Sequence, residues 1–410
     1  MTTTDETSAA AQGHLPGTAA YRRVVAALFA AGLATFTLLY STQAILPQLS
    51  ARFGVSTEAS TLTVSLTTLG LGAALLVAGP ISDRRGRTGL IHFSLAASSL
   101  IAIVCAFSPN WTTLLTLRLL EGVALAGLPA VATAYLREEL HPSAQARAAG
   151  LYIGGTALGG MTGRLLTGGV AEIAGWRWAL AAAAVLSLAC AFAVRMLLPS
   201  SARFAPTPPA AGTLVRASLR ALSDPALISL YLIGGCSAGA LVAVFNTLGF
   251  RLGDAPFHLG LAAASLLFLV YPVGTLSSAL FGRLADRFGR RAVMPLGCVL
   301  AVGGTLLTIP SALPTVVLGL ALLVGGFFAV HGVASGWVPA RAFAGGASTA
   351  QAASLYLFTY YLGSSVFGSL AGTAWTDAAW PGVVGLAAIL LCVAGTLALK
   401  LRRTPALQSP

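Results

Sequence analysis

Apolar residues occupy this chain in twelve long runs, and short polar segments separate each run from the next. An α-helix needs roughly 20 mostly apolar residues to cross the hydrocarbon core of a bilayer, and every run is close to that length. The runs lie near positions 24–46, 60–81, 90–108, 112–135, 147–172, 177–198, 224–249, 261–282, 292–309, 313–337, 351–373 and 381–400. The pattern predicts an all-α membrane protein with twelve transmembrane helices.

One polar loop sequence occurs twice, at the same place in two sets of six runs. Gly-Pro-Ile-Ser-Asp-Arg-Arg-Gly-Arg at 79–87 follows the second run, and Gly-Arg-Leu-Ala-Asp-Arg-Phe-Gly-Arg at 282–290 follows the eighth, 203 positions later. Gln43 and Asn246 are separated by the same offset. Such a repeat predicts two parallel six-helix bundles related by an axis along the membrane normal. The expected divisions are a tail at 1–22, a bundle at 23–199, a loop at 200–223, a bundle at 224–401 and a tail at 402–410.

The composition agrees with that of a membrane protein and excludes several other classes of protein. Of the 410 residues, 56% are hydrophobic and 9% are charged, whereas about 25% of residues are charged in a soluble domain. The five cysteines fall inside apolar runs without metal-ligand spacing, and the acidic and histidine side chains are too scattered for a catalytic cluster. We therefore expect no enzyme activity, no metal, no cofactor and no nucleic-acid partner.

The basic residues predict the orientation of the chain. Only Arg52, Arg177 and Arg251 fall on the side opposite the termini, while most other basic residues fall on the side that holds both termini. Because positive charge marks the cytoplasmic face, both tails and the loop at 200–223 are predicted to be cytoplasmic. Five of the six tryptophans then lie at the outer interface.

The loop between the two bundles contains a second amphipathic pattern. Apolar residues at 214, 215, 219 and 222 alternate with Arg216 and Arg220. This spacing predicts a short basic helix on the inner leaflet, although an ordinary solvated linker has the same composition.

Several of these motifs resemble those of the major facilitator superfamily of secondary transporters. The loop signature occurs at both expected places, Arg118-Leu-Leu-Glu121-Gly122 lies in the fourth run, and Thr-Gln-Ala-Ile-Leu-Pro at 42–47 ends the first. The chain looks most like bacterial proton-coupled exporters of drugs and sugars. The resemblance implies a monomeric inner-membrane protein that moves a small molecule and protons by alternating access.

The fifth run departs from the pattern of the exporters. It keeps their glycine spacing from Gly155 onward, but Gly160 stands in place of a proline and Arg164 in place of the last glycine. A proton-coupled uptake symporter for a sugar or organic anion therefore remains an alternative. A non-transporting membrane sensor is the alternative from another class.

The repeated loop is a candidate gate. The resemblance implies that its glycines let helix ends approach closely, and that Asp83 and Asp286 accept hydrogen bonds from loop arginines or a helix N-terminus. Such an ion network would hold the cytoplasmic side shut. The simpler alternative is that the arginines only set topology. The candidate gating residues are Gly79, Asp83, Arg84, Gly86, Arg87, Gly282, Asp286, Arg287, Gly289 and Arg290.

Three charged residues inside predicted helices are candidates for proton coupling: Arg118, Glu121 and Arg164. An arginine inside a span costs about 2.5–3.5 kcal/mol on insertion scales and needs a partner or a wet cavity. Glu121 is three residues from Arg118, on the same helix face. Burial disfavours the ionised carboxyl while the arginine favours it, so the group can load and release a proton. For the pair, the alternative is a permanent structural ion pair. Arg164 is expected either to balance the charge of Glu121 or to bind an anionic substrate.

Polar and aromatic residues inside other spans are candidates for the substrate cavity. Gln43 and Asn246 occupy equivalent positions on spans that line the central pathway in the family, where they either bind substrate or join helices. His331 is a possible donor, and packing is its alternative role. The aromatic candidates, suited to flat compounds, are Tyr40, Tyr271, Tyr356 and Tyr360.

Overall fold

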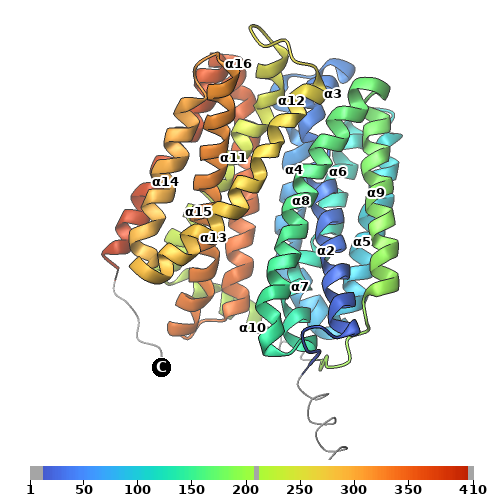
Figure 1. The fold of residues 1–410 in the computed structure, drawn as a ribbon, viewed down its shortest axis with the longest axis vertical. Helices are drawn as coiled ribbons and strands as arrows, with labels where there is room; N and C mark the ends of the chain where they lie inside the picture. Colours follow the sequence, from blue (N-terminus) through green and yellow to red (C-terminus); the bar gives the residue numbers. More distant parts are fainter. Residues whose placement is uncertain (1–12, 207–211, 405–410) are drawn as a thin grey trace, which may run out of the picture.

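The computed structural model describes residues 13–206 and 212–404, and these residues form a nearly all-helical bundle (Figure 1). Within them the β pairing recorded is an isolated bridge between His14 and Leu140. Parts of both predicted tails and of the predicted loop lie outside the described ranges. The helices before the loop are α2 (Ala19–Leu39), η1 (Gln43–Ile45), α3 (Leu46–Phe53), α4 (Thr57–Arg85), α5 (Arg87–Ala106), α6 (Trp111–Leu125), α7 (Gly127–Glu139), α8 (Pro142–Ala174) and α9 (Trp176–Leu197).

The loop itself contains α10 (Thr213–Leu222). The helices after it are α11 (Pro225–Gly253), α12 (Leu261–Ser265), η2 (Leu266–Val270), α13 (Tyr271–Phe288), α14 (Arg290–Leu307), α15 (Leu313–Ala344) and α16 (Thr349–Arg402). We call α2–α9 the N-half and α11–α16 the C-half, following the division predicted from the repeat.

The all-α membrane fold predicted from the apolar runs is confirmed. Among the described residues, ten helical segments are long and apolar enough to cross a membrane. That count omits α8, whose many glycines lower its hydropathy, and takes α16 as one segment. Non-helical backbone at Ala378 and Ala379 divides α16 into the two predicted spans 351–373 and 381–400. Adding α8 and dividing α16 gives the twelve predicted spans.

Some spans are not continuous α-helices. The first span stops at Leu39, and its helix resumes at Leu46 with Pro47 in the first turn. The eighth span passes through η2 before α13 starts with Pro272 in its first turn. Proline is tolerated there because a first-turn N–H has no intrahelical acceptor. These breaks place Tyr40, Gln43 and Tyr271 at interrupted backbone.

Glycines let the equivalent helices of each half cross at backbone contact. A Cβ at Gly159 of α8 would meet the carbonyl oxygen of Leu33 in α2, and a Cβ at Gly363 of α16 would meet that of Gly235 in α11. Gly159 and Gly363 are equivalent positions, 204 residues apart. The same close crossing therefore recurs in both halves.

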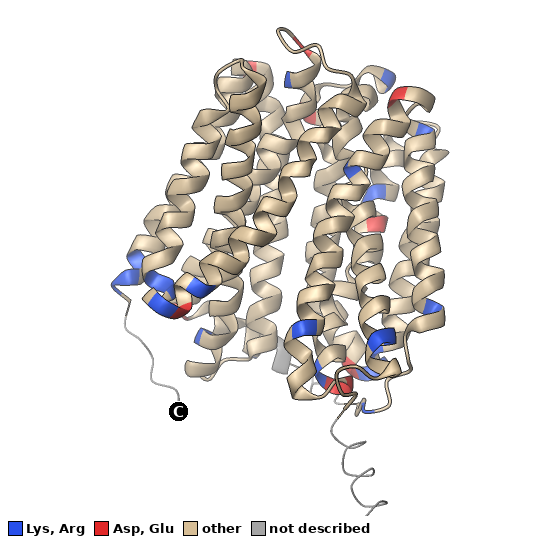
Figure 2. Cartoon of the chain, in the orientation of Figure 1, with Lys and Arg blue, Asp and Glu red and all other residues tan. Residues whose placement is uncertain are grey.

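The described part of the chain begins and ends, at residues 13 and 404, toward one face of the bundle, which we call the terminal face (Figure 1). Charged residues gather at this face and at the opposite face and are sparse between them (Figure 2). Contacts between the halves include Ser365 Oγ to Ser65 O at 2.7 Å and the N–H of Ala262 to Glu172 Oε2 at 2.7 Å. Toward the terminal face the two halves lean apart (Figure 1).

The amphipathic segment predicted between the bundles is helical. It forms α10, on which Val215 and Leu219 are exposed. The helix is tied to α16 by a hydrogen bond of 2.8 Å from Gln351 Nε2 to Ser218 Oγ. Its attachment to a membrane surface stays a prediction.

Candidate functional site

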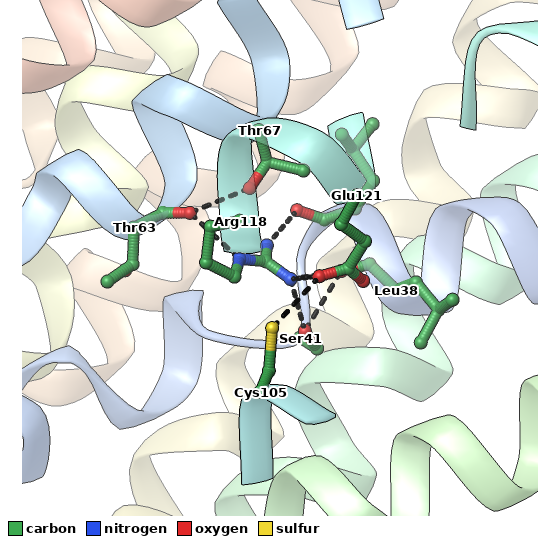
Figure 3. A network of polar contacts seen from close by, with 8 residues as sticks. Leu38, Ser41, Thr63, Thr67, Cys105, Arg118 and Glu121 are labelled. Carbon is green, nitrogen blue, oxygen red and sulfur yellow. Dashed lines mark hydrogen bonds and ion pairs between the residues drawn. The ribbon is translucent and has the colours of Figure 1, made fainter. Parts of the chain in front are cut away.

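The predicted ion pair of Arg118 and Glu121 is present inside the N-half. Arg118 NH1 lies 2.7 Å from Glu121 Oε2, and the two side chains are 1% and 0% exposed (Figure 3). Cys105 Sγ, on α5, donates to the same carboxyl oxygen at 3.8 Å. The other oxygen, Oε1, is buried without a hydrogen-bond partner among the described residues. The arginine is thus fully paired, whereas the carboxyl has an unused acceptor.

Arg118 also holds the broken end of the first span. Its guanidinium donates to the carbonyl oxygens of Leu38 at 3.2 Å and Leu39 at 3.1 Å, the last residues of α2 (Figure 3). It donates further to Ser41 Oγ and to the carbonyl oxygen of Thr63. Carbonyls at a helix C-terminus lack intrahelical donors, and an arginine satisfies them while complementing the helix dipole. The ion pair therefore acts directly on the backbone that leads to Tyr40 and Gln43.

Arg164 lies in a different environment, between the two halves. Its side chain is 1% exposed, and it donates from Nε to Gln43 Oε1 at 2.6 Å and from NH1 to the carbonyl oxygen of Gly160 at 2.8 Å. Its guanidinium carbon lies 4.1 Å from the ring centre of Tyr40, 4.9 Å from Phe268 and 4.6 Å from Tyr271. Arg164 therefore does not pair with Glu121, which was one of the two roles predicted for it.

Gln43 and Asn246, predicted as equivalent cavity residues, contact each other directly. Gln43 Nε2 donates to Asn246 Oδ1 at 2.6 Å, and Asn246 Nδ2 donates to the carbonyl oxygen of Gly368 at 3.1 Å. Gly368 is equivalent to Arg164, since both lie five residues after the matched glycines Gly363 and Gly159. The chain Arg164–Gln43–Asn246–Gly368 therefore crosses from one half to the other through equivalent positions.

The remaining candidates for the cavity form a second cluster in the C-half. His331 Nδ1 lies 2.9 Å from the hydroxyl of Tyr356, and the His331 ring packs against Tyr360 with ring centres 5.1 Å apart. Tyr360 is half-buried and packs against the apolar groups around both Tyr40 and Tyr271. Tyr360 thus joins the His331 cluster to the one around Arg164.

The first copy of the loop motif forms the predicted carboxylate–arginine contact. Arg87 donates to Asp83 Oδ1 at 2.5 Å and to Glu138 Oε1 at 2.8 Å, and it lies over the ring of Phe204. Gly86, with φ of 95°, ends α4 and precedes α5, a backbone conformation that favours glycine. All these partners belong to the N-half or the loop that follows it, so this network does not join the two halves.

The second copy of the motif has the same backbone without the same contacts. Gly289, with φ of 86°, ends α13. Asp286, Arg287 and Arg290 are exposed and take part in no ion pair found in residues 13–206 and 212–404. A hollow of about 480 Å³ lies beside Gly289 and Arg290, at the terminal-face ends of α14 and α15 and remote from Arg164.

The close approach expected at the first glycine of each motif is absent in this conformation. A Cβ at Gly79 or Gly282 would meet no atom within 4 Å. Both glycines lie in the last turns of their helices, α4 and α13, where no neighbouring backbone comes close. Arg84 and Arg85, the other basic residues of the first loop, are exposed.

Sequence reasoning missed several groups that the fold brings to these sites. Phe268 was not distinguished from other apolar residues of its span, yet it covers Arg164. Glu172, at the end of α8, accepts from the first turn of α12 across the two halves. Arg251 donates to the carbonyl oxygens of Thr308, Ile309 and Pro310 at the opposite face. None of these contacts joins residues close in sequence, so no local pattern signals them.

The sequence of the chain is similar to those of other proteins. Residues 27–279 match the sequence profile of the Major Facilitator Superfamily. The inner membrane transport protein YnfM of Escherichia coli (strain K12) is 40% identical over 387 residues, covering 94% of this chain and 92% of YnfM. YybF of Bacillus subtilis (strain 168), described as an uncharacterized MFS-type transporter, is 40% identical over 378 residues, covering 92% and 93%.

The fold is also similar to solved structures. A bacterial homologue of the human lysosomal transporter Spinster, in an inward-facing and occupied conformation, gives a TM-score of 0.77 at 16% identity, covering 95% of this chain and 98% of that one. The chain therefore belongs to the major facilitator superfamily. It is a multi-pass membrane transporter of small molecules and not an enzyme, as the motifs of the sequence predicted.

Proposed function

We propose that this chain is a proton-driven exporter of small organic molecules in the bacterial inner membrane. The terminal face is cytoplasmic, and the two halves rock about the Arg164 cluster to expose it to each side in turn. The excess of arginine on the terminal side supports this orientation. The lean of the halves in Figure 1 supports a conformation that opens toward the cytoplasm.

The observation that carries the proposal is the buried carboxyl of Glu121. It lies among membrane-spanning helices with one oxygen unpartnered, and its only charged partner is Arg118 within residues 13–206 and 212–404. Buried carboxyls inside membrane bundles are costly and mark proton relays and ion pathways. Protonation of Glu121 would remove the charge that fixes Arg118, and with it one restraint on the end of α2. Proton movement would then be linked to the backbone beside Tyr40 and Gln43.

Glu121→Gln should abolish proton-driven transport and keep transport that needs no proton. Glutamine retains hydrogen bonding to Arg118 but cannot ionise. Everted membrane vesicles would be energised, and uptake would be measured for a compound chosen from a growth-inhibition screen of expressing and deleted strains. Gradient-dependent uptake should fall to the level of vesicles without the protein, while exchange across unenergised vesicles continues.

A matched control shows whether the effect is specific to Glu121 or follows from the loss of any carboxyl group. Asp377 is exposed at the opposite face, so Asp377→Asn should leave both activities near those of the unsubstituted protein. Gradient-dependent uptake at the full rate in the Glu121 variant would remove this residue from the coupling mechanism. Accumulation by right-side-out cells, rather than by everted vesicles, would favour the uptake symporter instead.

Asp83→Asn should lower the maximal rate of transport several-fold while changing the half-saturating concentration little. Asp83 restrains Arg87 at the bend between α4 and α5, far from Arg164, so its loss affects the motion of the helix ends rather than substrate contact. Initial rates at a series of substrate concentrations measure both quantities. The equivalent Asp286→Asn, whose carboxylate is exposed, is the control and should have the smaller effect. If the two variants have equal maximal rates of transport, the loop motif serves only to set the topology of the chain.

A further inference from the structure

The two buried arginines of the N-half differ in how their charge is compensated. Arg118 has Glu121 at 2.7 Å. Arg164 is equally buried, yet no carboxylate lies within 4.0 Å of it in the described parts of the chain. Its hydrogen-bond acceptors are the neutral oxygens of Gln43 and Gly160. Burying a charge without an opposite charge is unfavourable, so the site favours an anion.

The surroundings of Arg164 indicate what else such an anion would carry. Tyr40 comes from the N-half, and Phe268 and Tyr271 come from the C-half, all with their rings within 5 Å of the guanidinium carbon. Ring faces attract a guanidinium, and they also provide flat apolar surface on which another ring can stack. The site therefore combines one positive charge with aromatic walls.

In this conformation the space around Arg164 is filled by the protein itself. Tyr40, Phe268 and Tyr271 are buried, and Gln43 bridges Arg164 to Asn246 across the halves. Separating the two halves around Arg164 would break the Gln43–Asn246 bond and withdraw the rings of the C-half. The groups that compensate the positive charge of the guanidinium would then be partly lost, at the moment when a ligand can enter the site.

We propose that Arg164 is the substrate anchor and that it binds aromatic monocarboxylates, with the carboxylate on its guanidinium and the ring between Tyr40 and the aromatic pair Phe268 and Tyr271. A single uncompensated arginine favours one negative charge over two. The planar guanidinium matches a carboxylate through two parallel hydrogen bonds. This inference rests on the proposed transport function and specifies its substrate.

The first test uses the unsubstituted, purified protein in detergent and measures binding by calorimetry. The probes are benzoate, its uncharged analogue benzamide, the dianion phthalate and the non-aromatic cyclohexanecarboxylate. Benzoate should bind at least tenfold more tightly than each of the other three. Equal affinity for benzoate and benzamide, or no binding of benzoate, would overturn the proposal.

Two variants test the role of Arg164 in binding benzoate. Arg164→Gln should reduce benzoate affinity at least tenfold. Gln43→Glu should do the same, because it places a carboxylate against Arg164 and occupies the anion site from within. The melting temperature of this variant checks that it folds. The control is Arg251→Lys, at another buried arginine, which donates to the carbonyl oxygens of Thr308, Ile309 and Pro310 rather than to the Arg164 cluster. This variant should bind benzoate as the unsubstituted protein does. Unchanged benzoate affinity in a folded Gln43→Glu protein would contradict the assignment.

The experiments distinguish a failure of this substrate proposal from a failure of the proposal of proton coupling. Benzoate binding to the Glu121→Gln variant should persist, because Glu121 does not contact the Arg164 cluster. If benzoate binds but proton-driven export is absent, the substrate assignment stands and the coupling proposal fails. If proton-driven export occurs with other compounds and benzoate does not bind, the substrate assignment alone fails.

Discussion

Arg118→Met should lower the free energy of unfolding by about 3–5 kcal/mol, the range found when one partner of a buried ion pair is removed. The substitution would leave Glu121 buried without its positive partner, and the carbonyl oxygens of Leu38, Leu39 and Thr63 without a donor. Methionine is similar in length and apolar, so the loss comes from electrostatics rather than from a cavity. The yield of monodisperse protein and its thermal unfolding in detergent measure the effect.

The double substitution Arg118→Met with Glu121→Met separates the ion pair from the rest of the arginine's contacts. Removing both charges should recover part of the lost stability, because no uncompensated carboxyl remains. Recovery should be incomplete, since the carbonyl oxygens at the end of α2 still lack a donor. A single variant as stable as the unsubstituted protein, or a double variant less stable than the single one, would show that the pair does not hold α2 in place.

Contacts between near neighbours in sequence were predicted well. Arg118 and Glu121 are three residues apart on one helix, so helix geometry alone places them together. Asp83 and Arg87 are separated by four residues and also meet. The fold as a whole followed from the twelve apolar runs and the repeated loop, because both patterns are local and periodic.

Contacts between residues far apart in sequence, including those between the halves, could not be predicted in the same way. Arg164 meets Gln43 across 121 residues, and it meets Phe268 and Tyr271 across the boundary between the halves. The repeat identified Gln43 and Asn246 as equivalent but gave no sign that they touch. Their contact requires both to lie near the axis that relates the halves, which only the packed structure shows. The unequal loop motifs have a similar explanation, since Glu138, the further partner of Arg87, lies outside the repeated segment.

The first span connects the two charged sites of the N-half. Arg118 holds the carbonyl oxygens at the end of α2. Tyr40 comes directly after this helix, and three residues later Gln43 bonds to Arg164. Only a short non-α segment separates the proposed proton site from the proposed anion site. Movement of that segment would change both at once, which is the physical requirement for coupling.

Gly159→Val should prevent the chain from forming a stable transporter. A Cβ at this position would lie against the backbone carbonyl of Leu33, and the adjacent α2 could not relieve the overlap by changing a rotamer. Overpacking typically costs about 1–3 kcal/mol, and contact with backbone places this variant at the upper end. The crossing also carries a hydrogen bond of 3.1 Å from Thr37 Oγ1 to the carbonyl oxygen of Gly159.

The control for this variant lies on the same helix. A Cβ at Gly154 would meet no atom within 4 Å, so Gly154→Val should fold with stability equal to or above that of the unsubstituted protein. Size-exclusion profiles and melting temperatures of the two purified variants provide the comparison. Because Arg164 lies five residues beyond Gly159, widening the crossing would also separate Arg164 from Gln43 and reduce benzoate affinity in any protein that folds. Equal stability and equal affinity in the two valine variants would show that the close crossing of α2 and α8 does not position the site.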